Sequence, residues 1–182
     1  MKTYIVLLRG INVSGQKKIK MADLRALLEK LGFSDVATYI QSGNIVLTSN
    51  LETEETVAHT IHQGIANRYG FKVPVLVKSR SDFAKILDEN PFTDPELLQN
   101  NYLYFVLLKQ RPDQEQIDRL QSEDYPNERF TITENCVYLG CLKGYGKAKL
   151  DNNLLERKLK VSATTRNYKT MMKLLEMSTM NQ

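Results

Sequence analysis

The apolar segment Tyr4-Ile5-Val6-Leu7-Leu8-Arg9 recurs in the second half of the chain as Tyr104-Phe105-Val106-Leu107-Leu108-Lys109. Each copy is a short continuous apolar run, which predicts a buried β-strand. Because side chains alternate across a strand, a run that is apolar at consecutive positions is expected to be buried on both faces. The repeat therefore predicts two similar halves, each built around a central strand, and it argues against an open RNA-binding sheet.

Helix and strand signals alternate after the first of these strands. Helices are marked by apolar residues three or four positions apart, and strands by short runs that end at turn-forming residues. The expected elements are a helix at 21–31, strands at 36–40 and 45–47, a helix through 57–65 that ends at Gly70, a strand at 71–77 and a short helix through 83–87. Pro74 cannot donate to a ladder, so it predicts that the fourth strand lies at a sheet edge.

The order β-α-β-β-α-β is that of a ferredoxin-like unit, and the second half repeats it. There we expect a helix at 113–122, strands at 129–133 and 136–142, a helix through 150–159, a strand at 161–165 and a final helix through 171–175. The chain is therefore expected to be an α+β protein made of two tandem ferredoxin-like βαββαβ subdomains, each with an extra closing helix. The subdomains are placed at 1–90 and 102–182, and a connection that contains Pro and Asn joins them at 91–101.

The composition is that of a globular protein. The 182 residues are 42% hydrophobic and 25% charged. The longest apolar run, 102–108, is far shorter than the roughly 18 residues of a membrane span. The apolar run at 4–8 is too short for the core of a signal peptide, and two cysteines do not make a disulfide scaffold. A cytoplasmic protein with no membrane partner is expected.

The charges are unevenly distributed along the chain. The net charge is +4, yet residues 1–30 carry seven Lys and Arg against two Asp and Glu, and residues 142–173 carry nine against two. The intervening region is acidic. Basic segments concentrate anions, so the two ends of the sequence favour an anionic partner, unless both are simply solvated surface.

Three segments carry a resemblance to a known family. They read LLRGINVSG at 7–15, TYIQSGN at 38–44 and ATTRN at 163–167. They resemble the LLRGINVGG, TYIQSGN and ATTRNW segments of a widespread bacterial family of uncharacterised proteins, the domain-of-unknown-function family 1697. Ser14 stands where that family has Gly, and Tyr168 where it usually has Trp. The resemblance covers the whole chain and implies the family's fold and a bacterial origin. Because the family has no established activity, it implies no catalytic role.

The loop Gly10–Lys20 joins a central strand to a helix, a place where backbone N–H groups can bind phosphate. Gly10 and Gly15 have the spacing of a P-loop, but that motif continues with Lys and Ser or Thr. This chain has Gln16 and Lys17 instead, which excludes a P-loop nucleoside triphosphatase. Two interpretations stay open: the glycines serve turn geometry, or the loop binds an anion.

A second basic region surrounds the end of the last strand. The guanidinium of Arg166 could form paired hydrogen bonds with phosphate or carboxylate, while Thr165 or Asn167 could cap the final helix. Lysines at 143, 147 and 149 lie in a glycine-containing loop. The candidate ligand-binding residues of the whole chain are Arg9, Gly10, Asn12, Gly15, Lys17, Lys18, Ser42, Asn44, Lys147, Lys149, Arg166 and Asn167.

The remaining residues of reactive types are expected to have structural roles. The segment 42–44 is a hairpin turn rather than a nucleophile turn, because G-x-S-x-G is absent. His59 and His62 are three apart on a helix, yet no further ligands accompany them, so we expect no metal and no cofactor. Cys136 and Cys141 lie five apart on one strand and face opposite sides, which favours small core residues over a redox pair.

The leading functional hypothesis is an uncharacterised protein that binds a phosphate-bearing ligand, either a nucleotide or a nucleic-acid backbone. We expect Arg9 or Asn12 to face Arg166 across a cleft between the subdomains, because two positive segments repel unless an anion, an acidic side chain or water separates them. One alternative is a hydrolase of phosphate or acyl-phosphate esters, which would use Arg9, Asn12 and Asn44. A further alternative is a structural or interaction protein without a small ligand.

Overall fold

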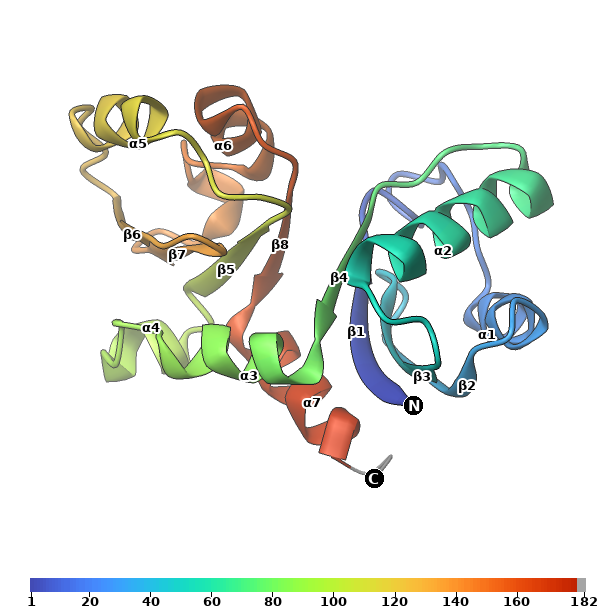
Figure 1. The fold of residues 1–182 in the computed structure, drawn as a ribbon. Helices are drawn as coiled ribbons and strands as arrows, with labels where there is room; N and C mark the ends of the chain where they lie inside the picture. The colour runs from blue at the N-terminus through green and yellow to red at the C-terminus, as the bar shows by residue number, and fades with distance from the viewer. Residues whose placement is uncertain (180–182) are drawn as a thin grey trace. The chain divides into compact units, whose positions relative to one another are not determined.

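The computed structural model describes residues 1–179 and places them in an α+β fold with two four-stranded antiparallel sheets (Figure 1). Seven α-helices occur in these residues. The elements of the first half are β1 (Lys2–Leu8), α1 (Met21–Lys30), β2 (Ser34–Tyr39), β3 (Asn44–Ser49), α2 (Glu54–Tyr69), β4 (Val75–Ser79) and α3 (Arg80–Asp88). Those of the second half are α4 (Pro95–Gln99), β5 (Leu103–Leu108), α5 (Gln114–Gln121), β6 (Glu128–Ile132), β7 (Cys136–Cys141), a 3₁₀ turn (Tyr145–Lys147), α6 (Asn152–Leu159), β8 (Ala163–Asn167) and α7 (Tyr168–Thr179).

The chain divides into two compact units. Among the described residues, unit 1 consists of 1–85 and 173–179, and unit 2 consists of 86–172. The predicted connection at 91–101 belongs to unit 2 because it contains α4, whose Leu97 is buried. A Cβ on Gly140 of β7 would lie 3.0 Å from Leu97 Cδ1, so this segment packs against the second sheet. The predicted role of 91–101 as a connection between two subdomains stays a prediction.

Sheet 1 has the strand order β2-β3-β1-β4, and every neighbouring pair is antiparallel. The first strand is central and the fourth lies at an edge, as the apolar run and Pro74 predicted. The predicted extent of the fourth strand was wrong, since β4 begins only at Val75. Pro74 has no N–H to donate, but its carbonyl accepts a hydrogen bond from the backbone N–H of Arg9 at 3.1 Å.

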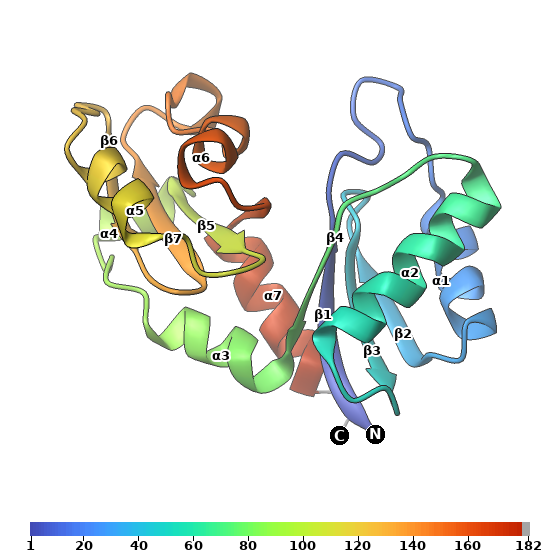
Figure 2. The same ribbon diagram turned by 45° about the horizontal axis from the view of Figure 1, so that its top comes forward.

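The core of unit 1 lies between sheet 1 and the helices α1 and α2, which cover the same face of the sheet (Figure 2). Leucines of α1 and isoleucines of α2 meet Tyr4, Val6 and Leu8 of β1 there. The alternate residues Ile5 and Leu7 are also buried, so both faces of β1 are covered, as its unbroken apolar run predicted. Helix α2 ends at Gly70, whose φ of +75° is a conformation that glycine adopts without strain.

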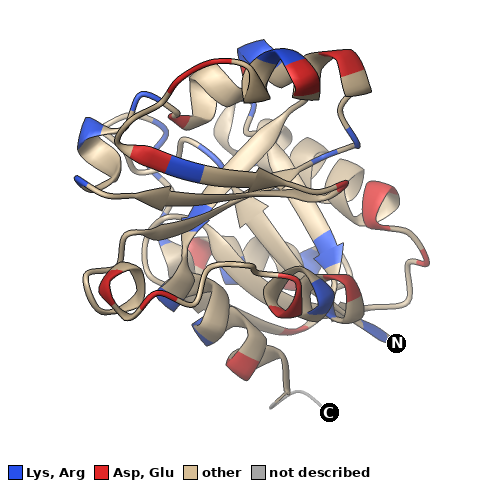
Figure 3. Ribbon diagram, turned by 90° about the vertical axis from the view of Figure 1, so that its left-hand side faces the viewer, with Lys and Arg blue, Asp and Glu red and all other residues tan. Residues whose placement is uncertain are grey.

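Sheet 2 repeats this arrangement with the strand order β6-β7-β5-β8, again antiparallel throughout. Its core includes Leu120 of α5 and Leu155 and Leu159 of α6, which pack on Val106 and Leu108 of β5. Both faces of β5 are buried as well. Figure 3 shows Lys and Arg on loops, helices and strands alike, so the basic residues are not gathered on one element. Within residues 1–179, no helix has the length and apolar character needed to cross a membrane.

Candidate functional site

The loop after β1 contains a tight hairpin turn at its tip. Val13 and Gln16 form an isolated bridge, with a hydrogen bond of 3.0 Å from Gln16 N–H to the Val13 carbonyl. The two central residues, Ser14 and Gly15, have φ of +51° and +75°, as in the tightest hairpins. Helix α1 begins only at Met21, so Gly15 does not lie at the start of the helix as the second glycine of a P-loop does.

The Asn12 side chain fastens this loop. Its Nδ2 donates to the carbonyl of Ile19 at 2.9 Å and to the carbonyl of Gln41 at 2.8 Å, while its Oδ1 accepts from Ile19 N–H at 2.9 Å. The amide thus closes the loop on itself and ties it to the turn between β2 and β3. Asn12 has a φ of +54°, a left-handed conformation that asparagine tolerates better than most residues.

An open pocket of about 370 Å³, called here the α1 pocket, lies beside the first turn of α1. Lys20 occupies the N-cap position, and its side chain makes no capping hydrogen bond. The first backbone N–H groups of a helix have no intrahelical partner and carry a partial positive charge. The residues that line the pocket are Asn12, Lys18, Ile19, Lys20, Asp23, Gln41 and Tyr69.

Tyr69, at the end of α2, lines the pocket, and its hydroxyl is shielded from solvent and has no hydrogen-bond partner within residues 1–179. Its ring stacks on Phe71 with centroids 5.8 Å apart, and the guanidinium of Arg68 lies over the ring. Burial, and after it the nearby carboxylate of Asp23, raises the pKa of Tyr69. The hydroxyl therefore stays protonated at neutral pH and can donate a hydrogen bond to a ligand.

The charged groups of the pocket are two lysines and one aspartate. Lys18 and Lys20 are exposed, and neither ammonium has an ion-pair or hydrogen-bond partner in the described part of the chain. Asp23 lies in the first turn of α1 and opposes an anion. Lys17, by contrast, is hydrogen-bonded outside the pocket, because its Nζ donates to the carbonyl of Lys72 at 2.8 Å.

Residues at the turn between β2 and β3 form hydrogen bonds within the protein. Asn44 is fully buried, and its Nδ2 donates to the carbonyl of Tyr39 at 3.1 Å and to Ser42 Oγ at 2.9 Å. With its amide donors engaged there, Asn44 is poorly placed to orient a water molecule, which counts against the hydrolase alternative. Arg9 is half-buried, and Gly10 next to it has a φ of +73°.

The remaining candidates lie in unit 2. Burial lowers the pKa of Arg166 to about 10, so the guanidinium keeps its charge at neutral pH, and its Nη1 donates to the Thr165 carbonyl at 2.9 Å. Lys147 and Lys149 are exposed. The relative placement of the two units is not determined, so a common cleft for Arg166 and the loop after β1 stays a prediction.

Asn167 is the N-cap of α7, because its Oδ1 accepts a hydrogen bond from Thr170 N–H at 2.9 Å. We expect Asn167→Ala to lower the free energy of unfolding by about 1 kcal/mol, since the cap is lost, whereas Asn167→Asp retains the acceptor and costs less. Urea denaturation followed by circular dichroism measures both. Equal losses for the two variants would show that the side-chain oxygen does not act as a cap.

Metal and redox chemistry find no assembled site in residues 1–179. No group of three or more His, Cys, Asp and Glu side chains in this part of the chain could hold a metal ion. His62 Nδ1 lies 2.8 Å from the Val73 carbonyl, and His59 is exposed. Cys136 and Cys141 are buried free thiols at the two ends of β7.

These features define a small α+β protein with a pocket beside one helix start that carries two lysines and one aspartate. The chain belongs to the family described as "Protein of unknown function (DUF1697)", which matches residues 1–138 and confirms the family resemblance. The matched range includes the segments at 7–15 and 38–44, whereas the segment at 163–167 lies outside it. It is similar to the structure of conserved bacterial protein SP0830 from Streptococcus pneumoniae, with 28% sequence identity and a TM-score of 0.78. That similarity covers 98% of this chain and 99% of the other. A search of curated proteins found no match.

Proposed function

We propose that this protein binds a phosphate-bearing anion, a nucleotide or a nucleic-acid backbone, in the α1 pocket. The observation that carries the proposal is Tyr69, a residue of the pocket lining whose hydroxyl is shielded from solvent and unpaired within residues 1–179. A buried donor without an acceptor costs about 1–3 kcal/mol, and a phosphate oxygen would remove that cost.

Three further kinds of donor surround the same space. The uncapped start of α1 presents backbone N–H groups, and Lys18 and Lys20 add positive charge. A helix start of this kind favours anions by itself, and lysine ammonium groups strengthen the attraction. The volume of about 370 Å³ fits a phosphate group together with part of the molecule that carries it.

Tyr69→Phe is the sharpest test of this function. We expect the variant to bind phosphate-bearing ligands about fivefold to tenfold more weakly, because one hydrogen bond to a charged group is lost. Its melting temperature without ligand should not fall, since the hydroxyl has no partner within residues 1–179 to lose. Isothermal titration with nucleotides and oligonucleotides measures the first effect, and thermal unfolding measures the second.

Charge variants of the pocket complete this test. Lys18→Ala and Lys20→Ala should weaken binding, Asp23→Asn should strengthen it, and Lys30→Ala at the other end of α1 should leave it unchanged. A steep loss of affinity with salt would identify a nucleic-acid backbone, while a weak dependence would identify a small nucleotide. The proposal is wrong if no ligand of either kind raises the melting temperature at low salt.

The proposal includes three finer points that the sequence predicted. Strand order and antiparallel pairing in each sheet support two ferredoxin-like subdomains. The buried free thiols of Cys136 and Cys141 support a reducing, cytoplasmic environment. The segments shared with the family, and the similarity to a bacterial protein, support a bacterial origin.

A further inference from the structure

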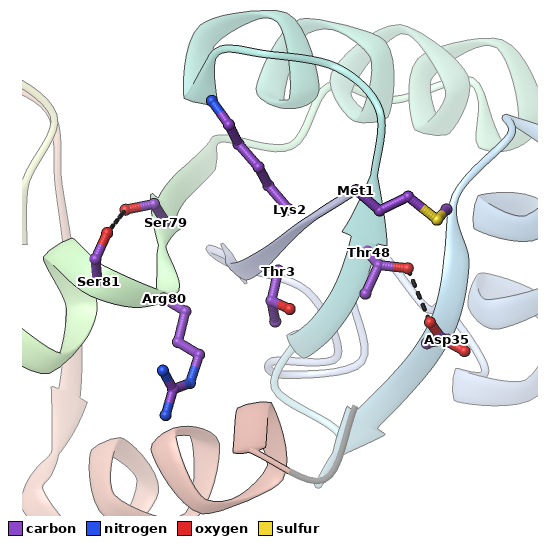
Figure 4. Close-up of a pocket in the computed structure, with 8 residues that line it drawn as sticks. All are labelled: Met1, Lys2, Thr3, Asp35, Thr48, Ser79, Arg80 and Ser81. Atoms are coloured by element: carbon purple, nitrogen blue, oxygen red, sulfur yellow. Dashed lines mark hydrogen bonds between the residues drawn. The ribbon is translucent and has the colours of Figure 1, made fainter. Parts of the chain in front are cut away.

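A second pocket, of about 570 Å³, lies at the end of sheet 1 where β1 begins and where β3 and β4 end (Figure 4). It is called here the β1 pocket. Its lining comes from the four strands of sheet 1 and from the start of α3. It shares no residue with the α1 pocket, and none of its residues is among the candidates that the sequence singled out.

Arg80, the first residue of α3, carries an unpaired donor in this pocket. Its Nε is shielded from solvent and has no hydrogen-bond partner within residues 1–179. The acid nearest in sequence is engaged elsewhere, because Asp82 Oδ2 accepts from Ser79 Oγ at 2.7 Å. Buried N–H donors in folded proteins are nearly always paired, so an unpaired one in a pocket wall points to a missing acceptor.

The other charged groups of the pocket already have partners. The Lys2 ammonium donates to the carbonyl of Glu52 at 3.2 Å. Asp35 Oδ2 accepts a hydrogen bond from Thr48 Oγ1 at 2.9 Å, and Asp35 has a further interaction besides. Neither group therefore needs a ligand. Arg80 remains as the charged group of the pocket on which a ligand can act.

The unpaired donor of Arg80 belongs to a group with a fixed shape. A guanidinium presents its N–H groups as a planar fork that matches the two oxygens of a carboxylate. We infer that the β1 pocket binds a small monocarboxylate, whose two oxygens accept the Nε–H and one Nη–H of Arg80. A rotation about the flexible arginine stem turns the Nε–H toward the ligand, and pairing removes the penalty of an unsatisfied donor.

The remaining groups of the pocket narrow the class of ligand. Figure 4 shows Thr3 between Arg80 and Asp35, where its hydroxyl can donate to a carboxylate oxygen. The Asp35 carboxylate repels a multiply charged anion more than a singly charged one, which disfavours phosphate. Met1, which is 72% exposed, adds an adaptable apolar wall for a short carbon chain. The volume of about 570 Å³ leaves room for such a chain beside the carboxylate.

The test uses four probes that differ in charge. Butyrate carries the carboxylate, butyramide has the same shape without the charge, butylammonium has the opposite charge, and inorganic phosphate is the competing anion. Binding to the full chain is followed by NMR of the backbone amides and of the Arg80 Nε–H. We expect butyrate to bind about tenfold more tightly than butyramide or butylammonium, and to shift the Arg80 Nε–H and the Thr3 and Thr48 amides.

Three variants assign the contacts. Arg80→Gln should weaken butyrate binding about tenfold, and Arg80→Lys, which keeps the charge without the fork, should show an intermediate loss. Thr3→Val keeps the shape but removes the hydroxyl and should weaken binding about threefold. Arg111→Gln, the same change at an exposed arginine in unit 2, is the matched control and should bind as the unaltered chain does.

Three results would overturn the inference: unchanged butyrate binding in Arg80→Gln, equal affinity for butyrate and butyramide, or tighter binding of phosphate than of butyrate at these amides. Circular dichroism shows whether each variant is folded. If Arg80→Gln does not fold, the Nε–H of the unaltered chain decides, since a signal that butyrate leaves in place contradicts the pairing. Tyr69→Phe should leave butyrate binding unchanged, so a failure here leaves the proposed function standing, and the reverse holds equally.

Discussion

Gly43→Ala is expected to lower the free energy of unfolding by about 3 kcal/mol, the sum of a strained φ and an overpacked contact. Gly43 has a φ of +79°, and a Cβ there would lie 2.6 Å from Leu8 Cβ and 3.0 Å from Ile11 Cδ1. Leu8 Cβ belongs to the buried central strand, so it cannot move aside as the end of a flexible side chain could. The Gly43 carbonyl also accepts the Leu8 N–H at 2.8 Å, which holds the turn against β1.

Gly15→Ala is the matched control for this prediction. Gly15 has nearly the same φ, +75°, but no atom lies within 4 Å of a Cβ placed there. We expect it to cost about 1 kcal/mol, because only the backbone strain remains. Urea denaturation of the two variants and the unaltered chain separates the two contributions. Equal losses would mean that the close approach of the turn to Leu8 contributes nothing measurable.

Much of the fold could be predicted because its signals are local. The apolar repeat at 4–8 and 104–108 identified both central strands, and glycines at helix ends marked the stops of α1 and α2. The errors lie where a local signal was ambiguous. The segment 71–74 is apolar enough for a strand, but Pro74 has no N–H, so ladder pairing begins only at Val75. Helix α4 was missed, although Pro95 at its first position is a typical helix start.

The candidate site was predicted only in part. The loop between Gly10 and Lys20 was singled out by its glycines and charge, and it supplies Asn12, Lys18 and Lys20 to the α1 pocket. Tyr69 could not be found in this way, because it lies at the end of α2 and reaches the pocket only through the packing of unit 1.

Asn12→Ala carries the second large expected effect, a loss of about 3 kcal/mol in the free energy of unfolding. The three hydrogen bonds together account for about 2 kcal/mol of this loss, and the remainder arises because alanine tolerates a φ of +54° less well than asparagine does. The carbonyls of Ile19 and Gln41 lose their donor and must find water. Urea denaturation measures the loss.

Two companion variants separate the causes of the Asn12 effect. Asn12→Gly also loses the three hydrogen bonds, but glycine adopts the positive φ freely, so a smaller loss of about 2 kcal/mol is expected. Asn12→Asp keeps the acceptor for Ile19 N–H but turns a carboxylate oxygen toward two carbonyl oxygens, so it should lose at least as much as Asn12→Gly.

Lys17→Ala is the control within the same loop, because it removes a single hydrogen bond, to the Lys72 carbonyl, and should cost about 1 kcal/mol or less. If Asn12→Ala were no more destabilising than Lys17→Ala, the Asn12 amide would not be what closes the loop. The contrast bears on the α1 pocket, since the amide that ties Ile19 to Gln41 fixes two residues of the pocket lining. If Asn12→Ala is the more destabilising variant, Asn12 supports the proposed anion site by holding the loop in place, whereas Lys18, Lys20 and Tyr69 would contact the anion directly.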